Sequence, residues 1–382
     1  MNEFSKEKIH AVHAFHSSLE NYDRPPLHRL PKLAAKLKVG AVLVKDESER
    51  LGLNAFKILG CIYAISKYLA REYGLAEDGT LFSTLMDGLR SGAFAPKTFV
   101  TATDGNHGRA VARAARLLGQ RAVVYMPQGS AAIRVERIRQ EGAECAVTDQ
   151  NYDETVRHAS DMAAAHQWVL MQDTAWRGYE EIPLWIMQGY GTIAQEIREA
   201  LGEAREAPPT HVILQAGVGS FAGGVGASLS QQYQGHDMTF IIVEPDAADC
   251  IFQSIRQNAP AVVTGDLNTV MAGLACGQPS TIGLQVLKQI GDTFITCDDS
   301  IAATGVRVLG APLVGDPRII AGESGAVGLG VLMALMQKPE HAALRQRLRL
   351  DDQARVLIIN TEGNTDPASY ERITWEGHCP SA

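Results

Sequence analysis

Residues 211–233 have the sequence HVILQAGVGSFAGGVGASLSQQY. An apolar strand over 211–215 leads into a glycine-rich turn, and a helix of small and apolar residues follows at 223–233. Glycine lets a backbone approach an anionic group closely, and the N-terminus of a helix favours a phosphate. This order predicts a parallel α/β fold with a ligand beyond the carboxyl end of the strand.

The same alternation of strand and helix extends along most of the chain. Runs rich in Val, Ile and Leu predict buried strands at 39–44, 98–102, 122–126, 211–215, 239–243 and 355–360. Helices are predicted at 58–73, 108–118, 133–141, 152–165, 190–200 and 223–233. Such alternation is typical of parallel sheets with helices on both faces.

Length and charge narrow the class of protein. The chain has 382 residues, more than the roughly 250–300 at which single cores stop growing, and its net charge is −8. An acidic balance argues against a nucleic-acid partner, and no apolar run reaches the roughly 18–20 residues that cross a bilayer. Without a signal-like N-terminus, we expect a cytoplasmic protein. The six cysteines form no CxxC pair, so no metal site is predicted.

Two composition breaks indicate domain boundaries. One is the stretch 79–96, which contains several Gly and a Pro, and the other is 205–209, where two prolines precede a strand. We expect residues 1–79 and 179–382 to form a larger domain and residues 80–178 a smaller one.

Three further segments carry candidate functional groups. Lys57 ends KDESERLGLNAFK and opens an apolar helix, where it is either a nucleophile activated by burial or a helix-end lysine that reaches solvent. The loop in VTATDGNHGR (100–109) is either an anion site at a helix N-terminus or a turn capped by Asp104. The strand VLII runs out into TEGNTD (361–366), whose hydroxyls either bind a ligand or form a turn.

An aromatic segment, residues 169–191, surrounds Asp173. Its tryptophans and tyrosines either line a pocket for an amine or pack against one another. The glycine-rich turn also has an alternative interpretation. Gly217, Gly219 and Ala222 fit a dinucleotide pattern, and Glu244 ends the next strand, so the segment alone permits an NAD site.

Taken together, these segments resemble the fold-type II pyridoxal-phosphate enzymes of the tryptophan synthase β-like group, from about residue 45 to 366. More narrowly, five strings look like those of the diaminopropionate ammonia-lyases. They are NAFKILG (54–60), TATDGNHGR (101–109), QDTAW (172–176), IPLWIMQGYGT (182–192) and TEGNTD (361–366). The resemblance implies an α/β fold of two lobes, each an open, mostly parallel sheet flanked by helices, with pyridoxal 5′-phosphate in the cleft between them.

The resemblance also implies a role for each site residue. Lys57 would form the internal aldimine, and Asn106 would bind the ring hydroxyl of the cofactor. Thr361, rather than Thr365, would face the pyridine nitrogen. The phosphate would be held by Gly217, Val218, Gly219, Ser220 and Phe221. The substrate carboxylate would be held by the loop of Thr103, Asp104, Gly105 and His107.

The implied reaction is α,β-elimination of 2,3-diaminopropionate, in both D and L forms, to pyruvate and two ammonia through an aminoacrylate. Lys57 would remove the Cα proton, with the cofactor as electron sink. Asp104 would act as base for the D-isomer, and Asp173 would bind the distal amine. Catalytic roles therefore fall on Lys57, Asp104 and Asp173.

Three alternatives remain open on the residues. A serine or threonine dehydratase would share Lys57, Asn106 and the glycine-rich turn. An NAD-dependent oxidoreductase would leave Lys57 unexplained, and a regulatory protein that only holds the cofactor would not need both aspartates. For partners, the resemblance implies a small amino-acid substrate and a homodimer, with no membrane or nucleic acid.

Overall fold

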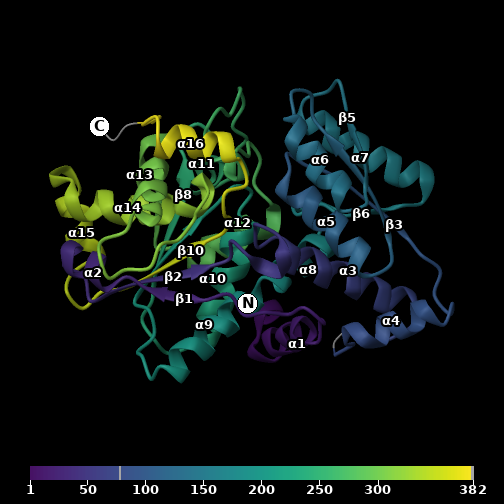
Figure 1. Cartoon of the computed structure of the whole chain (residues 1–382), viewed down its shortest axis with the longest axis horizontal. Coiled ribbons are helices and arrows are strands. Elements are labelled where there is room, and N and C mark those ends of the chain that lie inside the picture. Colours follow the sequence, from purple (N-terminus) through teal and green to yellow (C-terminus); the bar gives the residue numbers. More distant parts are fainter. Residues whose placement is uncertain (77–78, 380–382) are drawn as a thin grey trace. The chain divides into compact units, whose positions relative to one another are not determined.

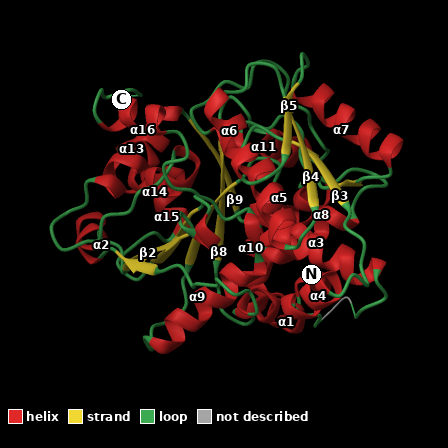
Figure 2. Cartoon of the chain, turned by 45° about the vertical axis from the view of Figure 1, so that its right-hand side comes forward, coloured by secondary structure: helices red, strands yellow, loops and turns green. Residues whose placement is uncertain are grey.

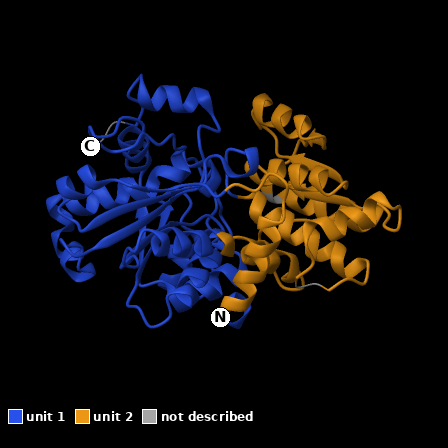
Figure 3. Cartoon of the chain, turned by 60° about the horizontal axis from the view of Figure 1, so that its bottom comes forward, with its two compact units in different colours: residues 1–4, 24–56, 193–382 blue, residues 5–23, 57–192 orange. Residues whose placement is uncertain are grey.

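The computed structural model describes residues 1–76 and 79–379. Its internal contacts divide the chain into two compact units, coloured separately in Figure 3. Unit 1 comprises residues 1–4, 24–56 and 193–382, and unit 2 comprises residues 5–23 and 57–192. Each unit has its own sheet, and the strands lie among helices (Figure 2).

Unit 1 is built on a six-stranded sheet whose described strands follow the order β1-β2-β10-β7-β8-β9. Of these, β1, β2, β10 and β8 are labelled in Figure 1. Only the edge strand β1 is antiparallel to its neighbour. The strands are β1 (Leu27–Arg29), β2 (Ala41–Asp46), β7 (His211–Gln215), β8 (Thr239–Pro245), β9 (Thr293–Cys297) and β10 (Arg355–Asn360). Because β2, β10, β7 and β8 are parallel, their carboxyl ends meet at one edge of the sheet.

Helices cover both faces of this sheet. On one face, Gly328 of α14 approaches the side chains of Ile213 and Ile358, and on the other Gly226 of α10 approaches Leu214. Alternate residues of one strand therefore enter different cores. The helices of unit 1 are α2 (Pro31–Leu37), α9 (Gly191–Glu203, whose first two residues belong to unit 2), α10 (Ser220–Gln232), α11 (Cys250–Gln257), α12 (Thr281–Ile290), α13 (Asp299–Gly310), α14 (Glu323–Gln337), α15 (Ala342–Leu348) and α16 (Pro367–Thr374), with short 3₁₀ turns at Asn2–Phe4, Arg50–Gly52, Ala272–Leu274 and Pro339–His341.

Unit 2 contains a four-stranded, fully parallel sheet in the order β5-β4-β3-β6. Ala159 and Ala163 of α7 pack against Val100 on one face, and Gly108 of α5 lies against Val124 on the other. The strands are β3 (Thr98–Ala102), β4 (Arg121–Met126), β5 (Glu144–Val147) and β6 (Val169–Leu170). The helices are α1 (Lys6–Ser17), α3 (Ile58–Glu72), α4 (Phe82–Arg90), α5 (Asn106–Leu117), α6 (Ala132–Gln140), α7 (Tyr152–His166) and α8 (Glu181–Gly189).

The compact units do not follow the predicted domain limits at every point. Residues 5–23, 57–76 and 179–192, expected in the larger domain, group with the smaller sheet, because α1 packs on α3 and α8 and α3 packs on α5. The stretch 79–96, expected as a break, contains α4, whose Phe82 and Leu85 are buried. Among the described helices, none combines the length and the apolar character that crossing a membrane requires.

Two helices begin two or three residues earlier than predicted. α5 begins at Asn106 rather than 108, and α10 begins at Ser220 rather than 223. Asn106, Ser220 and Phe221 therefore belong to first helical turns, where backbone N–H groups have no acceptor inside the helix.

Candidate active site

The predicted site residues fall into two groups, one in each unit. In unit 2, Lys57 stands at the N-cap of α3, and its Nζ lies 2.6 Å from Oδ2 of Asp173. The Lys57 side chain is 21% exposed and that of Asp173 is 11% exposed. The amine is therefore paired and still reachable, unlike a lysine sealed in a core or one at the open surface.

Asp173 is held in place by the backbone that precedes it. The Tyr179 hydroxyl donates to the Leu170 carbonyl and accepts from the Gln172 N–H, both at 2.9 Å. The Tyr179 ring in turn stacks on Trp176 at 4.4 Å between centroids. These aromatic residues pack and orient the strand end; the amine next to the carboxylate is that of Lys57.

Electrostatics keep the Asp173 carboxyl ionised. Burial would raise its pKa, but His107 and Lys57, together with the hydrogen bond from Lys57, outweigh burial and hold the pKa of Asp173 well below its usual range. An ionised carboxylate at this position suits the binding of an ammonium group.

His107 is engaged within unit 2. Its Nε2 lies 2.7 Å from the Met171 carbonyl, which can only accept, so Nε2 carries a proton. Its Nδ1 faces the Cys61 sulfur at 3.7 Å and Asp173 at 3.6 Å. Burial lowers the pKa of His107, against the opposing charge of Asp173. The ring thus fixes the 103–107 loop against the end of β6.

The 103–107 loop is shaped by a side chain and a glycine. Thr103 Oγ1 accepts from the N–H groups of Gly105 and Gly108 at 2.9 and 3.1 Å, so the threonine, and not Asp104, caps this turn. Gly105 has φ +154°, a conformation that L side chains rarely adopt. Burial raises the pKa of Asp104 to about 6, against the opposing charges of Arg134 and Lys57. This carboxyl can therefore gain or lose a proton near neutral pH.

In unit 1, the glycine-rich turn leads into α10. Gly219 has φ +91°, and a Cβ at Gly217 would lie 3.0 Å from the Cys276 sulfur, so both positions require glycine. The Phe221 ring packs against Phe56 at 4.5 Å between centroids. The turn therefore places backbone N–H groups at the N-terminus of α10, where they have no acceptor inside the helix.

Thr361 follows β10 and is 4% exposed. Its carbonyl accepts from the Phe56 N–H at 3.1 Å, so the segment just before Lys57 in sequence is tied to Thr361. Its hydroxyl accepts from Gln215 Nε2 at 3.0 Å. Thr365, the other candidate hydroxyl, lies 3.2 Å from Oε2 of Glu362 and is engaged there.

Glu244, the residue on which the NAD interpretation depended, has a structural role. Its carboxylate accepts the N–H groups of Ile251 and Phe252 at 2.8 and 2.6 Å, at the start of α11, and it is 1% exposed. Its oxygens are thus engaged by the backbone and not by a ribose.

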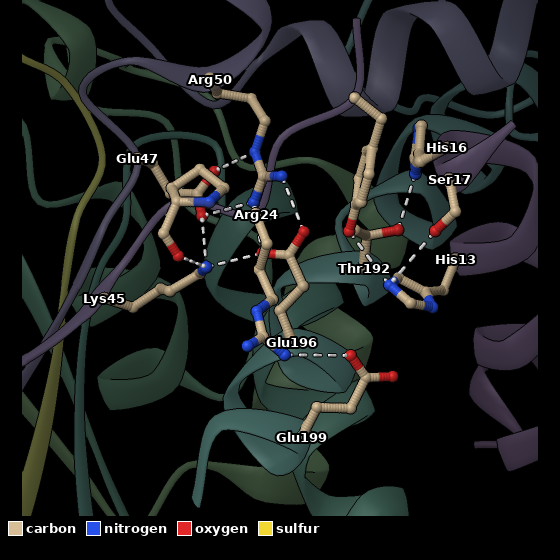
Figure 4. A network of polar contacts seen from close by, with 12 residues as sticks. His13, His16, Ser17, Arg24, Lys45, Glu47, Arg50, Thr192, Glu196 and Glu199 are labelled. Atoms are coloured by element: carbon tan, nitrogen blue, oxygen red, sulfur yellow. Dashed lines mark hydrogen bonds and ion pairs between the residues drawn. The ribbon is translucent and has the colours of Figure 1, made fainter. Parts of the chain in front are cut away.

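Sequence reasoning missed a buried cluster of charges in unit 1, which we call the ion cluster: Lys45, Glu47, Arg50 and Glu196 (Figure 4). Arg50 binds Glu47 through two contacts of 2.8 Å and Glu196 through two of 2.7 Å. Lys45 Nζ lies 2.6 Å from Glu196. No sequence signal joins Arg50 to Glu196, which lies 146 residues away.

These residues fit pyridoxal phosphate. Lys57 is a reachable amine, and the glycine-rich turn forms an anion cradle at the start of α10, where backbone N–H groups have no acceptor inside the helix. Within the described part of the chain, the hydrogen bond to Thr361 that the structure shows uses its oxygen as acceptor, which leaves its proton for a ligand. The amine, the anion cradle and the hydroxyl donor correspond to the aldehyde, phosphate and ring nitrogen of the cofactor.

Comparisons with known proteins agree with this fit. Residues 19–362 match the family described as pyridoxal-phosphate dependent enzyme. The diaminopropionate ammonia-lyase of Escherichia coli (strain K12) is 50% identical over 374 residues, covering 98% of this chain and 93% of the relative. The solved structure of the Escherichia coli diaminopropionate ammonia lyase in complex with D-serine has a TM-score of 0.93 at 48% identity, covering 100% of this chain and 95% of that chain. A second structure, in complex with an aminoacrylate-PLP azomethine reaction intermediate, has a TM-score of 0.91 at 48% identity, covering 99% and 94%.

The matches extend over nearly the whole chain and include both units. They favour the fold-type II elimination enzyme over the oxidoreductase and over a protein that only holds the cofactor. The chain belongs to the pyridoxal-phosphate dependent enzymes of fold type II, among the diaminopropionate ammonia-lyases.

Proposed function

We propose that this protein catalyses the elimination of 2,3-diaminopropionate, in its D and L forms, to pyruvate and two ammonia. One water is consumed: the β-amino group leaves as the first ammonia, and hydrolysis releases the α-amino group as the second. The observation that carries the proposal is the Lys57–Asp173 pair beside Asp104, in a chain 50% identical to a diaminopropionate ammonia-lyase.

Lys57 has two tasks in this proposal. Its amine attaches the cofactor, and after the substrate amine takes its place, the freed amine removes the Cα proton. Pyridoxal phosphate, when bound, supplies the electron sink for the resulting carbanion. The pairing of Lys57 with Asp173 at 2.6 Å holds the amine in a fixed direction before substrate arrives.

Asp173 is proposed as the residue that recognises the distal amine. It is ionised and largely buried, and its partner is a lysine ammonium, which is chemically close to the β-ammonium of the substrate. The neutral hydroxyl of serine would gain much less from this carboxylate. Asp173 thus supports a preference for diaminopropionate over serine.

Asp104 is proposed as the base for the D-isomer. Removal of a proton from the opposite face of Cα needs a second base, and a carboxyl with a pKa of about 6 accepts a proton near neutral pH. The N–H groups of Asn106 and His107 in the 103–107 loop are proposed to hold the substrate carboxylate, with the hydroxyl of Thr103 and the N–H of Gly105 shaping the turn.

In unit 1, the backbone from Gly217 to Phe221, including Val218, Gly219 and Ser220, is proposed to bind the phosphate. Thr361 is proposed to donate to the pyridine nitrogen and Asn106, in unit 2, to the ring hydroxyl. The homodimer and the cytoplasmic location stay predictions.

The test is a product assay on the holoenzyme with D- and L-diaminopropionate and, separately, D- and L-serine. We expect one pyruvate and two ammonia per diaminopropionate consumed, for both isomers, with a change in visible absorption that reverses when substrate is exhausted. Serine turned over as fast as diaminopropionate would contradict the proposal in favour of a dehydratase, and a cofactor band that no substrate perturbs would contradict elimination altogether.

A further inference from the structure

Gln215, the last residue of β7, makes an unusual set of contacts beside Thr361. Its side chain is 1% exposed. Its Nε2 lies 2.9 Å from the Ser324 carbonyl, 3.0 Å from the Ile359 carbonyl and 3.0 Å from Thr361 Oγ1. Its Oε1 has no hydrogen-bond partner among the described residues.

The two carbonyls fix which way the amide faces. A carbonyl oxygen only accepts, so the end of the amide that faces both of them must be the NH₂ group. A flipped amide would direct Oε1 at two carbonyl oxygens in a buried site, which is repulsive. The two neighbouring carbonyls therefore fix the orientation of the Gln215 amide.

This orientation decides the direction of the Thr361 hydroxyl. An amide nitrogen has two N–H donors and no lone pair to offer, so the hydroxyl cannot donate to Gln215 and accepts from it instead. The two donors serve three acceptors, so one N–H is shared between two of them. Its lone pair is directed at Gln215, and its proton is directed elsewhere. In the described part of the chain, the structure shows no protein acceptor for this proton, although the residue is 4% exposed. A buried donor in this position suits a ligand atom that accepts.

We propose that Gln215 is a positioning residue that orients the Thr361 hydroxyl as a hydrogen-bond donor to the pyridine nitrogen of the cofactor. A nitrogen that accepts a hydrogen bond from an alcohol stays unprotonated, because the alcohol is far too weak an acid to give up its proton. The substrate carbanion is then less delocalised into the ring, which favours expulsion of the β-amino group over reprotonation at Cα. This inference rests on the proposed function.

The test uses holoenzyme reconstituted with pyridoxal phosphate labelled with ¹⁵N in the ring, and reads the ¹⁵N chemical shift of the bound cofactor. Thr361→Val removes the donor, and we expect the resonance to move downfield, toward that of a pyridine without a hydrogen bond. Gln215→Met keeps the length of the side chain and removes the amide, and we expect the same direction of shift. Because Gln215 acts through Thr361, the double variant should match Thr361→Val with nothing added.

Gln232→Met is the matched control. Gln232 lies on α10 in the same unit, is 5% exposed, and donates to Gln195 Oε1 at 2.6 Å. Gln232→Met makes the same substitution at another buried glutamine. We expect the bound cofactor in this variant to keep the ¹⁵N chemical shift of the wild type.

Two failures are distinguishable. If Thr361→Val moves the resonance and Gln215→Met does not, the positioning role of Gln215 is wrong and the proposed site stands. If Thr361→Val leaves the resonance unchanged, the assignment of Thr361 itself is wrong. Ser324→Ala then tests the neighbouring hydroxyl, which is buried without a hydrogen-bond partner among the described residues.

If Gln215→Met does not fold, Thr361→Ser tests the positioning role of Gln215. Thr361→Ser keeps the hydroxyl and removes the methyl group that restricts its rotation. If Gln215 orients the hydroxyl, Thr361→Ser should retain the wild-type shift. A shift equal to that of Thr361→Val would mean that packing of the methyl group sets the direction, which overturns the proposal.

Discussion

Two ion pairs between a basic side chain and a carboxylate differ in their burial and in the number of their contacts. In unit 1, Arg50 and Glu196 of the ion cluster are both 0% exposed and meet through two contacts of 2.7 Å. In unit 2, Lys57 and Asp173 meet through one contact of 2.6 Å and are 21% and 11% exposed. The first pair is sealed and doubly bound, and the second is singly bound and accessible.

The surroundings of the two pairs differ in the same way. The ion cluster balances two cations against two carboxylates, and Lys45 has a further acceptor in the Pro25 carbonyl at 2.5 Å. Leu51, the residue after Arg50, has φ 49°, a strained left-handed conformation for a residue with a side chain. Beside Lys57 lie instead two carboxyls, one ionised and one with a pKa of about 6. Buried charges whose hydrogen bonds are all made within the protein stabilise the local backbone. Accessible charges that can form further hydrogen bonds can exchange partners with a substrate.

The largest expected effect comes from Lys57→Arg. The guanidinium keeps a positive charge beside Asp173, so we expect the urea midpoint of unfolding to change little. Elimination requires an amine that can attach the cofactor and move a proton, so kcat/KM should fall by roughly 10⁴- to 10⁶-fold. Residual activity within tenfold of wild type would contradict the role of Lys57.

The opposite pattern is expected for Arg50→Met. Loss of the guanidinium removes its hydrogen bonds to Glu47 and Glu196 and leaves Lys45 facing both carboxylates within a buried site. Breaking a buried pair from one side costs about 3–5 kcal/mol, which urea unfolding followed by circular dichroism would measure. Arg24→Met is the matched control, since the Arg24–Glu203 pair is 35% and 61% exposed and should contribute only about 0.2–1 kcal/mol. Equal losses in both variants would show that the cluster has no special structural role.

A similar contrast in burial, between interior and edge strands, explains which strands were predicted from the sequence. All six predicted strands are interior ones: β2, β10, β7 and β8 in one sheet and β4 and β3 in the other. The four strands that were missed, β1, β9, β5 and β6, are the sheet edges. Interior parallel strands are continuous apolar runs, whereas β9 is half-buried along its whole length and β6 has two residues.

The residues of the candidate site also differ in how far they could be predicted from the sequence. Lys57, Asp104 and Asp173 were predicted because they stand in strings that resemble a family, and the structure brings all three into one electrostatic environment in unit 2. Gln215 was missed although its position carries a signal, since a polar amide ends an otherwise apolar strand. Arg50 and Glu196 could not be paired from sequence, because ion pairing leaves no local pattern across 146 residues.

A smaller effect is expected for Asp173→Asn. The amide keeps the shape of the side chain and removes the charge that would bind the distal ammonium. We expect kcat/KM for diaminopropionate to fall about tenfold to a hundredfold relative to that for serine, since a hydrogen bond to a charged group contributes about 1.5–3 kcal/mol. Serine serves as the internal control, because its hydroxyl does not require the carboxylate. A variant with unchanged selectivity would leave Asp173 with only its pairing to Lys57.

The smallest effect is a difference between two pH profiles of the wild-type enzyme. Burial raises the pKa of Asp104 to about 6, so the ionised form that acts as a base is lost as the pH falls through that value. The rate with D-diaminopropionate should therefore drop roughly tenfold between pH 8 and pH 5 relative to the rate with the L-isomer, for which Lys57 is the base. Asp104→Asn should abolish turnover of the D-isomer, while the L-isomer is still consumed. Parallel profiles for the two isomers, or full activity of Asp104→Asn on the D-isomer, would mean that one base serves both faces of Cα. The open carboxyl pair beside Lys57 would then divide into a binding group, Asp173, and a neighbour that tunes the charge around it.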